Sequence, residues 1–448
     1  MLLCYLIFGK DIMAPPFIMC AAFIFSVLCC MYNIDYWKVS LSWKTYGVIV
    51  GGISVFIFVS GFVRALFPVP VVRRNEKTAP DSTDEPVYVK RGAVIAFLIL
   101  SFVVTALYLG EVMRIALSYG GGATWASRMY AYRKAYSYGI LNMDESIPMG
   151  IRLAYNFVLT GGYVCVYLFM HELVYKKKIN KLLSVALIAV LLASLVNANR
   201  RLLLAYPIIG LVIYYVLWHR KHGWHRMMSG RFALRGALLL MTFSALFVAF
   251  RATVGRNTEY SPVYYVTFYA GASVQNLDLF LQNPPPDSSL WGKETFSVLY
   301  NNIGQLFDIP ALRYVQQLEP RVSNGVSTGN VYTGFRDYLY DFGLPGFIVL
   351  TSIMSAVMMI FYLSVKSKRS GYKHERPDFS LLVYAYAAQG VFLHFFNEKF
   401  YTFISISSLR DVVFLYVITL GFCARGTKAK KTRNARRRFA YSRRFIKG

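Results

Sequence analysis

The sequence predicts an all-α polytopic membrane protein, a bundle of about ten transmembrane helices with a large loop outside the cytoplasm. Nine long stretches carry no Asp, Glu, Lys or Arg, and a helix of about 20 such residues crosses the roughly 30 Å hydrocarbon core of a bilayer. Hydrophobic residues make up 56% of the 448 residues and charged residues 16%, which is typical of one membrane bundle and not of several soluble domains. The loops between the stretches also alternate in basicity.

The expected spans follow one another along the chain. The nine uncharged spans are Ile12–Ile34, Thr45–Val63, Gly92–Gly110, Leu153–Met170, Leu182–Asn199, Leu202–Trp218, Gly236–Phe250, Phe342–Val365 and Phe379–Asn397. A tenth, Thr402–Ala424, is interrupted only by Arg410 and Asp411. Residues 1–424 are therefore expected to form a single transmembrane domain.

The distribution of charge predicts the topology. When successive loops are assigned to alternate sides, one side receives 32 of the 49 Lys and Arg residues. Basic loops stay in the cytoplasm, so both termini are expected there. The net charge of +27 is then mainly a topology signal, and no nucleic acid is expected as the principal partner.

The segment 425–448 is a basic cytoplasmic tail that contains no acidic residue. We expect it to lie on the anionic headgroups of membrane lipids. A contact with nucleic acid or with a partner protein is the alternative for this tail alone.

Two long segments are expected outside the cytoplasm, residues 111–152 and 251–341. The second is rich in Tyr, Phe and Trp, whereas disordered segments are poor in aromatic residues. Within it, Pro262–Leu281 has apolar residues at helical spacing, which predicts an amphipathic helix lying on the outer membrane surface.

The sequence gives no sign of a metal or cofactor site. Its six cysteines lie in or beside apolar spans and lack the spacing of metal ligands. There is no glycine-rich phosphate loop and no zinc-protease helix motif. We therefore expect neither a metal nor a cofactor, which disfavours a nucleotide-driven pump.

Arginines recur at the expected external ends of the spans. They are Arg114, Arg200, Arg201, Arg251, Arg256 and Arg410. Guanidinium groups bind phosphate and diphosphate oxygens in a bidentate manner, so a ring of these arginines around one external cavity would bind such an anion. For a single arginine, contact with lipid headgroups or a salt bridge is the alternative.

Acidic residues on the same face are candidates for accepting a proton from an attacking hydroxyl group. Asp337 and Asp341 are the first candidates. Arg336–Asp337 and Arg410–Asp411 are adjacent opposite charges, and because adjacent helical side chains point in different directions, each is expected to find its partner elsewhere. His394, near Glu398, is a candidate substrate contact, although a lone His in a helix is more often a hydrogen-bonded structural residue.

Three segments carry a family resemblance. Thr328–Leu350 resembles the signature before a late span in bacterial repeat-unit polymerases, the O-antigen and capsule polymerases of the Wzy type. Asn197–Leu204 is similar to their turn of small residues and arginine, although the doubled Arg200–Arg201 leaves the matching arginine open. Phe250–Leu281 is similar to their arginine-led external loop. The matching positions are Asn330, Thr333, Asp341, Phe342, Gly343, Gly346, Leu277, Asp278, Phe280 and Leu281.

The resemblance implies a membrane glycosyltransferase of the GT-C type in the bacterial plasma (inner) membrane. Such enzymes join undecaprenyl-diphosphate-linked oligosaccharide repeat units on the outer face of the membrane, without a nucleotide sugar or a metal. It also implies a chain-length regulator and a flippase as partners. The alternatives are an O-antigen ligase, which has a different acceptor, and a lipid-linked oligosaccharide flippase or transporter, although the chain lacks the internal repeat common in transporters.

These considerations assign roles to individual residues as a hypothesis. The catalytic candidates, which would hold the donor diphosphate or orient the acceptor hydroxyl, are Arg251, Arg200, Arg201, Asp341 and Asp337. The substrate-binding candidates are Arg256, Arg114, Arg336, Arg410, Tyr332, Asn330, His394 and Glu398. Fixed cations would stabilise the negative charge that grows on the leaving diphosphate in the transition state.

Overall fold

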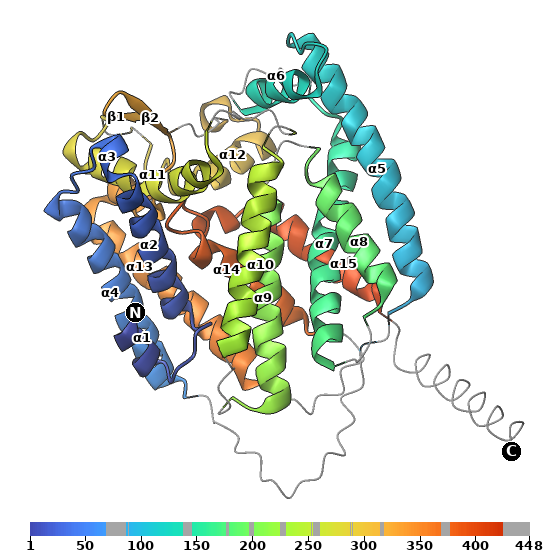
Figure 1. The fold of residues 1–448 in the computed structure, drawn as a ribbon, viewed down its shortest axis with the longest axis horizontal. Helices are drawn as coiled ribbons and strands as arrows, with labels where there is room; N and C mark the ends of the chain where they lie inside the picture. The colour runs from blue at the N-terminus through green and yellow to red at the C-terminus, as the bar shows by residue number, and fades with distance from the viewer. Residues whose placement is uncertain are drawn as a thin grey trace, which may run out of the picture.

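The computed structural model describes residues 1–68, 87, 89–137, 146–175, 179–196, 201–224, 230–251, 253, 260–286, 288, 290–313, 318–368 and 377–423. Within these residues the chain is mostly helical and contains one two-stranded antiparallel sheet. The long helices stand side by side as a bundle (Figure 1). The basic segment 425–448 lies outside the described residues.

Six helices are long and apolar enough to cross a membrane. They are α2 (Pro15–Tyr32), α4 (Trp43–Leu66), α5 (Arg91–Ser118), α7 (Met149–Tyr175), α9 (Arg201–His222) and α13 (Gly334–Ser367). Each contains or largely overlaps one of the predicted spans. The prediction of an all-α membrane protein is confirmed at this level.

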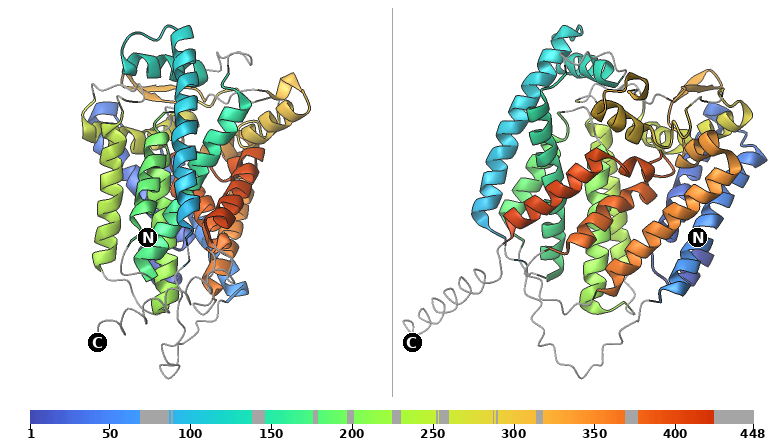
Figure 2. Two further views of the ribbon diagram at one scale, coloured as in Figure 1. Left: turned by 90° about the vertical axis from the view of Figure 1, so that its right-hand side faces the viewer. Right: turned by 180° about the vertical axis from the view of Figure 1, so that it is seen from behind.

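The other four predicted spans also coincide with helices. These are α8 (Lys181–Ala193), α10 (Gly230–Ala249), α14 (Phe379–Phe392) and α15 (Ile406–Phe422). Helices α8, α14 and α15 have 13, 14 and 17 residues, so at 1.5 Å per residue each is shorter than the hydrocarbon core. Helices α14 and α15 also run obliquely through the bundle (Figure 2). Ten membrane crossings therefore stay a prediction.

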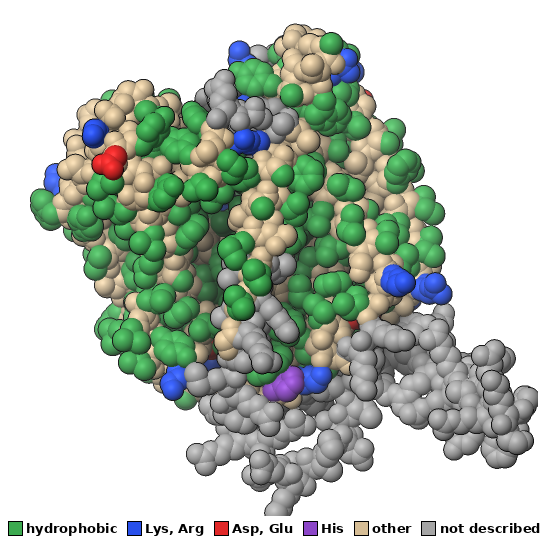
Figure 3. Space-filling model, viewed as in Figure 1, with side chains coloured by type: hydrophobic (Ala, Val, Ile, Leu, Met, Phe, Trp, Pro, Cys, Tyr) green, Lys and Arg blue, Asp and Glu red, His purple; other side chains and the backbone are tan. Residues whose placement is uncertain are grey.

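The outer surface of the bundle is apolar over its middle. In the most apolar 18-residue stretch of α4, and likewise in that of α5, only 28% of the residues are buried within the protein. Phe58 and Phe102 are 76% and 79% exposed. On the face drawn in Figure 3, hydrophobic side chains cover the middle, and the visible Lys and Arg lie toward the two ends. Exposure of an apolar surface of this extent to water is unfavourable, whereas the hydrocarbon core of a bilayer would cover it.

The elements between the long helices gather at one end of the bundle (Figure 1), which we call the loop end. They are α3 (Ile34–Trp37), α6 (Trp125–Ser137), α11 (Pro262–Gln282), α12 (Ser297–Leu306), β1 (Arg321–Ser323) and β2 (Val326–Gly329). Two short 3₁₀ turns, Pro310–Leu312 and Tyr401–Phe403, and the N-terminal helix α1 (Leu2–Ile7) complete the described elements. The described parts of segments 111–152 and 251–341 thus contribute to the same end.

Helix α11 forms over almost the predicted range, but the predicted position on the membrane surface is wrong. Ser261 caps its first turn, and Pro262 follows at the first helical position, as is common at helix starts. Residues 270–278 are all buried. A Cβ added to Gly271 would lie 2.5 Å from the backbone nitrogen of Cys30, so α11 packs directly against the backbone of α2.

The polar side chains of α11 bind other segments instead of facing water. Asn276 Nδ2 donates to the carbonyl groups of Thr328, Gly329 and Val331, at 2.9–3.2 Å. Asp278 Oδ1 accepts hydrogen bonds from the Ser42 amide and from the Thr45 hydroxyl at the start of α4. These internal partners explain why a helix of mixed polarity is buried. The pattern of polar and apolar residues within 262–281 did not predict these partners.

Helix α13 consists of two helical pieces joined at Gly343. This residue has φ 61° and ψ −161°, a conformation that favours glycine. Pro345 lies two residues further on, where its fixed φ suits the start of a new helix. Residues 334–342 therefore form a separate short helix at the loop end, and the remainder of α13 runs through the bundle.

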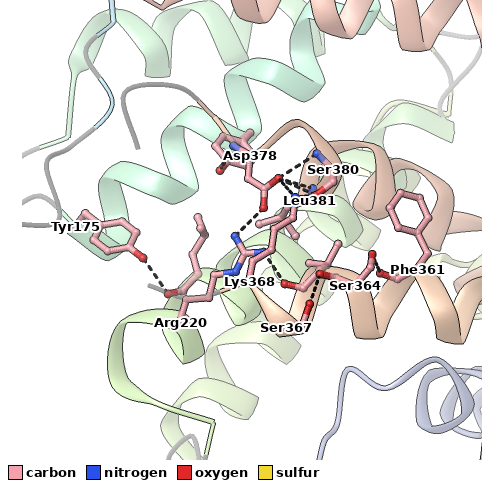
Figure 4. A network of polar contacts seen from close by, with 12 residues as sticks. Tyr175, Arg220, Phe361, Ser364, Ser367, Lys368, Asp378, Ser380 and Leu381 are labelled. Atoms are coloured by element: carbon pink, nitrogen blue, oxygen red, sulfur yellow. Dashed lines mark hydrogen bonds and ion pairs between the residues drawn. The ribbon is translucent and has the colours of Figure 1, made fainter. Parts of the chain in front are cut away.

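Two buried ionic networks lie at the opposite end. Asp11 accepts hydrogen bonds from the hydroxyls of Tyr215 and Tyr362 at 2.7–2.9 Å and from Lys366 at 2.5 Å. In the second network, Arg220 forms an ion pair with Asp378 at 2.9 Å (Figure 4). Together these contacts join the N-terminal segment, α9, α13 and the start of α14.

Candidate functional site

A deeply buried charged group of the loop end is the guanidinium of Arg336, in the first piece of α13. The residue is 1% exposed. Arg336 forms an ion pair with Glu294, and its Nη1 also lies 3.4 Å from Asp337 Oδ1. The main partner of Arg336 is thus distant in sequence, as expected, although the neighbouring Asp337 contributes as well.

Three aromatic rings surround the same guanidinium. Its central carbon lies 4.8 Å from the ring centroid of Phe280, 5.0 Å from that of Tyr332 and 4.8 Å from that of Tyr340. Cations are attracted to the faces of such rings, most strongly when they are desolvated. The Tyr332 hydroxyl donates to the Glu319 carbonyl and accepts a hydrogen bond from Arg321. Tyr332 is therefore fixed, and it contacts Arg336 as a ring.

Asp341 closes this cluster from the side of residues 290–296. Its carboxylate accepts hydrogen bonds from the backbone amides of Glu294 and Thr295, the latter at 2.6 Å. Asp341 thereby orients the turn that carries Glu294. We define the Arg336 cluster as Glu294, Arg336, Asp337, Asp341 and the three rings above. The cluster contains three carboxyl groups and one guanidinium, so acidic partners within the protein balance the charge of Arg336.

His394 and Glu398 lie next to the Arg336 cluster. His394 is fully buried, and its ring centroid lies 4.8 Å from Phe335 and 5.6 Å from Tyr338. Its carbonyl accepts the amide of Gly334 at 2.7 Å, which fixes the start of α13. A larger residue does not fit at position 334, because a Cβ added to Gly334 would collide with the His394 ring.

Glu398 holds the turn that leads toward α15. Its carboxylate accepts hydrogen bonds from the amides of Tyr401 and Thr402 at 2.7 and 3.1 Å. The Tyr338 hydroxyl lies 3.3 Å away. Burial raises the pKa of Glu398, and the amide hydrogen bonds oppose that rise. These contacts give Glu398 a structural role beside the cluster.

Arg251 lies at a second position of the loop end. It lies two residues after the end of α10, and its Nη1 donates to the Tyr260 carbonyl at 2.6 Å. Its guanidinium carbon lies 5.5 Å from the ring centroid of Tyr265. Helices α9 and α10 are consecutive and run side by side (Figure 1). The start of α9 at Arg201 and the end of α10 before Arg251 are therefore at the same end of this pair.

The remaining arginines of the hypothesis are dispersed or not described. Arg114 is exposed and binds Glu111, three residues earlier on α5, at 2.9 Å. Arg410 binds Asp411 at 2.7 Å, so the expectation that these neighbours find separate partners is wrong for this pair. Asp411 also accepts a hydrogen bond from Tyr386. Arg200, Arg256 and the side chain of Arg201 lie outside the described residues, so a ring of arginines stays a prediction.

Of the thirteen predicted residues, the fold brings six into one region: Arg336, Asp337, Asp341, Tyr332, His394 and Glu398. Asn330 follows β2 and is exposed. Two further residues of the loop end were not predicted from the sequence: Glu294, the ion-pair partner of Arg336, and Asn276, which holds β2. A single acid in a short polar segment has no distinguishing pattern, so nothing in the sequence marked Glu294. Among the described residues, no group of three or more His, Cys, Asp or Glu side chains could hold a metal ion.

Comparisons of the chain with protein-family models, with curated proteins and with solved structures found no match. The chemistry of the loop end is therefore derived from its own residues.

Proposed function

We propose that the protein is a membrane glycosyltransferase that joins undecaprenyl-diphosphate-linked oligosaccharide repeat units into a polysaccharide such as an O-antigen or capsule. In this proposal the protein crosses the bacterial plasma membrane ten times, its loop end faces outward, and both termini are cytoplasmic. It uses no metal and no cofactor, and a chain-length regulator and a flippase are its partners.

The observation that carries the proposal is the concentration of polar and aromatic groups at one end of an otherwise apolar bundle. Fixed cations, buried carboxyl groups and tyrosines gather in the elements of the loop end. Buried charged groups in a membrane protein are costly and typically serve function. A lipid-linked sugar presents its diphosphate and its sugar rings at this level of a bilayer, where these groups would meet them.

The roles divide between the two positions of the loop end. Arg251, together with Arg200, Arg201 and Arg256, holds the donor diphosphate and stabilises the charge that develops on it. The Arg336 cluster supplies the carboxyl groups, and Asp337 is the group that orients or deprotonates the acceptor hydroxyl. Asp341 has two backbone amides as partners, so we assign it a positioning role.

The opposite end favours surface chemistry over transport. Tyrosine hydroxyls and Lys366 surround Asp11, and Arg220 pairs with Asp378 in a buried position. These contacts tie helices α9, α13 and α14 together. Passage of a saccharide between these helices would require the contacts to open, and buried pairs are costly to break.

A polymerisation assay with purified protein in lipid vesicles tests the proposal. The substrate is the lipid-linked repeat unit, and the product is measured as a ladder of chain lengths. Arg251→Ala is expected to lower the rate about 100-fold, the usual effect of removing one group that stabilises a developing anion. The control is Arg313→Ala, because Arg313 pairs with the exposed Asp308; this variant is expected to keep the wild-type rate.

Full activity in both Arg251→Ala and the double variant Arg200→Ala/Arg201→Ala would refute the assignment of the donor site. A deletion strain separates the alternatives. Loss of long chains with single units still attached identifies a polymerase, whereas loss of all attached units identifies a ligase or a flippase.

A further inference from the structure

Three aromatic side chains form a compact cluster at the start of α11. Tyr260 precedes the helix, and Tyr264 and Phe268 follow at intervals of four residues, which places Tyr264 and Phe268 on one face. Ring centroids are 5.0 Å apart for Tyr260 and Tyr264, 5.9 Å apart for Tyr264 and Phe268 and 6.3 Å apart for Tyr260 and Phe268, so the three rings form a triangle. All three side chains are partly exposed, so the cluster is not part of the buried core.

Helix α3 widens and supports this cluster. The Tyr36 ring lies 5.1 Å from that of Tyr264, and Tyr36 is 51% exposed. Trp37 is fully buried beneath, with its ring 6.0 Å from that of Phe268 and its Nε1 donating to the Tyr264 hydroxyl. We call Tyr36, Tyr260, Tyr264 and Phe268 the aromatic platform.

Hydrogen bonds to the β1–β2 hairpin hold the support of the platform in place. Ser323 Oγ donates to the Trp37 carbonyl at 2.7 Å, and Asn324 Nδ2 donates to the Tyr36 carbonyl at 3.1 Å. Tyrosine and tryptophan rings lose little conformational entropy on binding, since they have only two side-chain torsions. A surface already held in position loses still less.

The chemistry around the platform indicates its ligand. A pyranose ring has one face of C–H groups, which packs on an aromatic ring, and a rim of hydroxyls, which need polar partners; tyrosine supplies both. Arg251 donates to the carbonyl of Tyr260 and lies over Tyr265, the residue after Tyr264. A cation is therefore fixed at one edge of the platform, which suits a ligand in which a phosphate adjoins a sugar.

We propose that the aromatic platform is a saccharide-binding subsite, on which the clustered rings of Tyr260, Tyr264 and Phe268 pack against a sugar of the repeat unit while its diphosphate end lies toward Arg251. This inference rests on the proposed function for the identity of the sugar. The binding itself requires no reaction, so it can be measured separately.

Binding of the free repeat-unit oligosaccharide, without lipid or diphosphate, tests the platform. The full-length protein is placed in nanodiscs, and the dissociation constant is measured by saturation-transfer NMR titration. Tyr264→Leu keeps an apolar side chain but removes the ring, and is expected to weaken binding roughly three- to tenfold, the usual range for one aromatic contact. Tyr264→Phe keeps the ring and is expected to retain most of the affinity.

Tyr130→Leu is the matched control. Tyr130 is 52% exposed on α6, also at the loop end, so its replacement alters an exposed tyrosine outside the platform. It is expected to leave sugar affinity unchanged. Equal affinity of Tyr264→Leu and the wild type, or an equal loss in Tyr130→Leu, would overturn the platform, since aromatic residues that merely contact lipid headgroups would give one of these results.

The polymerisation assay distinguishes this failure from failure of the proposed function. If the wild type polymerises and Tyr264→Leu binds sugar normally, the platform is wrong and the function stands. If the wild type binds sugar through Tyr264 but elongates no lipid-linked chain, the platform stands and the polymerase assignment is wrong.

Discussion

At the scale of single residues, Arg336 illustrates how a buried charge can be both costly and necessary. Its guanidinium is out of contact with water, and its stability in that place depends on Glu294, Asp337 and three ring faces. Removing a buried ion alone leaves its partners desolvated and uncompensated. The residue is thus a structural requirement for the loop end whatever chemistry occurs there.

We predict that Arg336→Ala lowers the free energy of unfolding by about 3–5 kcal/mol, since it leaves two buried carboxyl groups without their cation. Arg313→Ala is the comparison, because its partner Asp308 is 89% exposed and a surface pair contributes about 1 kcal/mol or less. Thermal unfolding of both variants in the same detergent measures the difference. Equal losses would show that the Arg336 pair is solvated and would contradict the burial described above.

Sequence reasoning found many of these residues but not their connections. Arg336, Asp337 and Asp341 were identifiable because they occur within one short charged segment before a span. Glu294 was not, because its role depends on a contact across 42 positions of the chain, and no local pattern encodes such a contact. Asp341 was expected in catalysis; its hydrogen bonds to two backbone amides support the positioning role that we propose for it instead.

At the scale of elements, the break in α13 explains why Asp, Phe and Gly follow one another at positions 341–343. Asp341 anchors a neighbouring turn, Phe342 packs 4.7 Å from the ring of Trp291, and Gly343 adopts the positive φ that separates the two helical pieces. The first piece can therefore hold the Arg336 cluster at an orientation independent of the long helix.

Gly343→Ala is expected to destabilise the protein by about 1–2 kcal/mol, because an L-residue with a Cβ is strained at positive φ. Gly51→Ala is the control, since Gly51 lies within helix α4 with open space around its Cα; there alanine is expected to be neutral or slightly stabilising. Chemical denaturation of the two variants provides the comparison. A neutral Gly343→Ala would mean that α13 can continue without the break.

The positions of the helices were predictable, but their environments were not. Hydropathy located all ten apolar segments, because the free energy of burying a long uncharged helix depends on composition. It placed α11 on the membrane surface, whereas this helix is enclosed by α2 and α4. Ser273, Gln275, Asn276 and Asp278 are polar but buried, and only tertiary partners reveal that their hydrogen bonds are satisfied.

At the scale of the whole molecule, the two ends of the bundle differ in kind. The loop end carries the hairpin and the short helices (Figure 1). The opposite end carries the network of Asp11 and that of Asp378 (Figure 4). The sequence predicted which segments share an end from alternation alone. The orientation of the two ends in the membrane is inferred from the distribution of Lys and Arg between the loops.

Cysteine labelling tests that orientation. All six native cysteines are buried, so a single added cysteine would dominate the reaction with a membrane-impermeant maleimide. Ser327, in β2, and Ser367, at the end of α13, are both exposed. In spheroplasts we expect Ser327→Cys to react directly and Ser367→Cys to react only after the membrane is permeabilised. The reverse pattern would place the loop end in the cytoplasm and would exclude polymerisation on the outer face.

The contacts of helix α11 also determine where residues can be inserted into the chain or deleted from it. Through Gly271, Asn276 and Asp278 it contacts α2, the hairpin and the start of α4 along fewer than three turns. An insertion of one residue between Gly271 and Asn276 would rotate the following side chains by about 100° and separate both polar anchors from their partners at once. Homologous proteins should therefore vary in loop length after Asn283 while keeping the spacing within this helix constant.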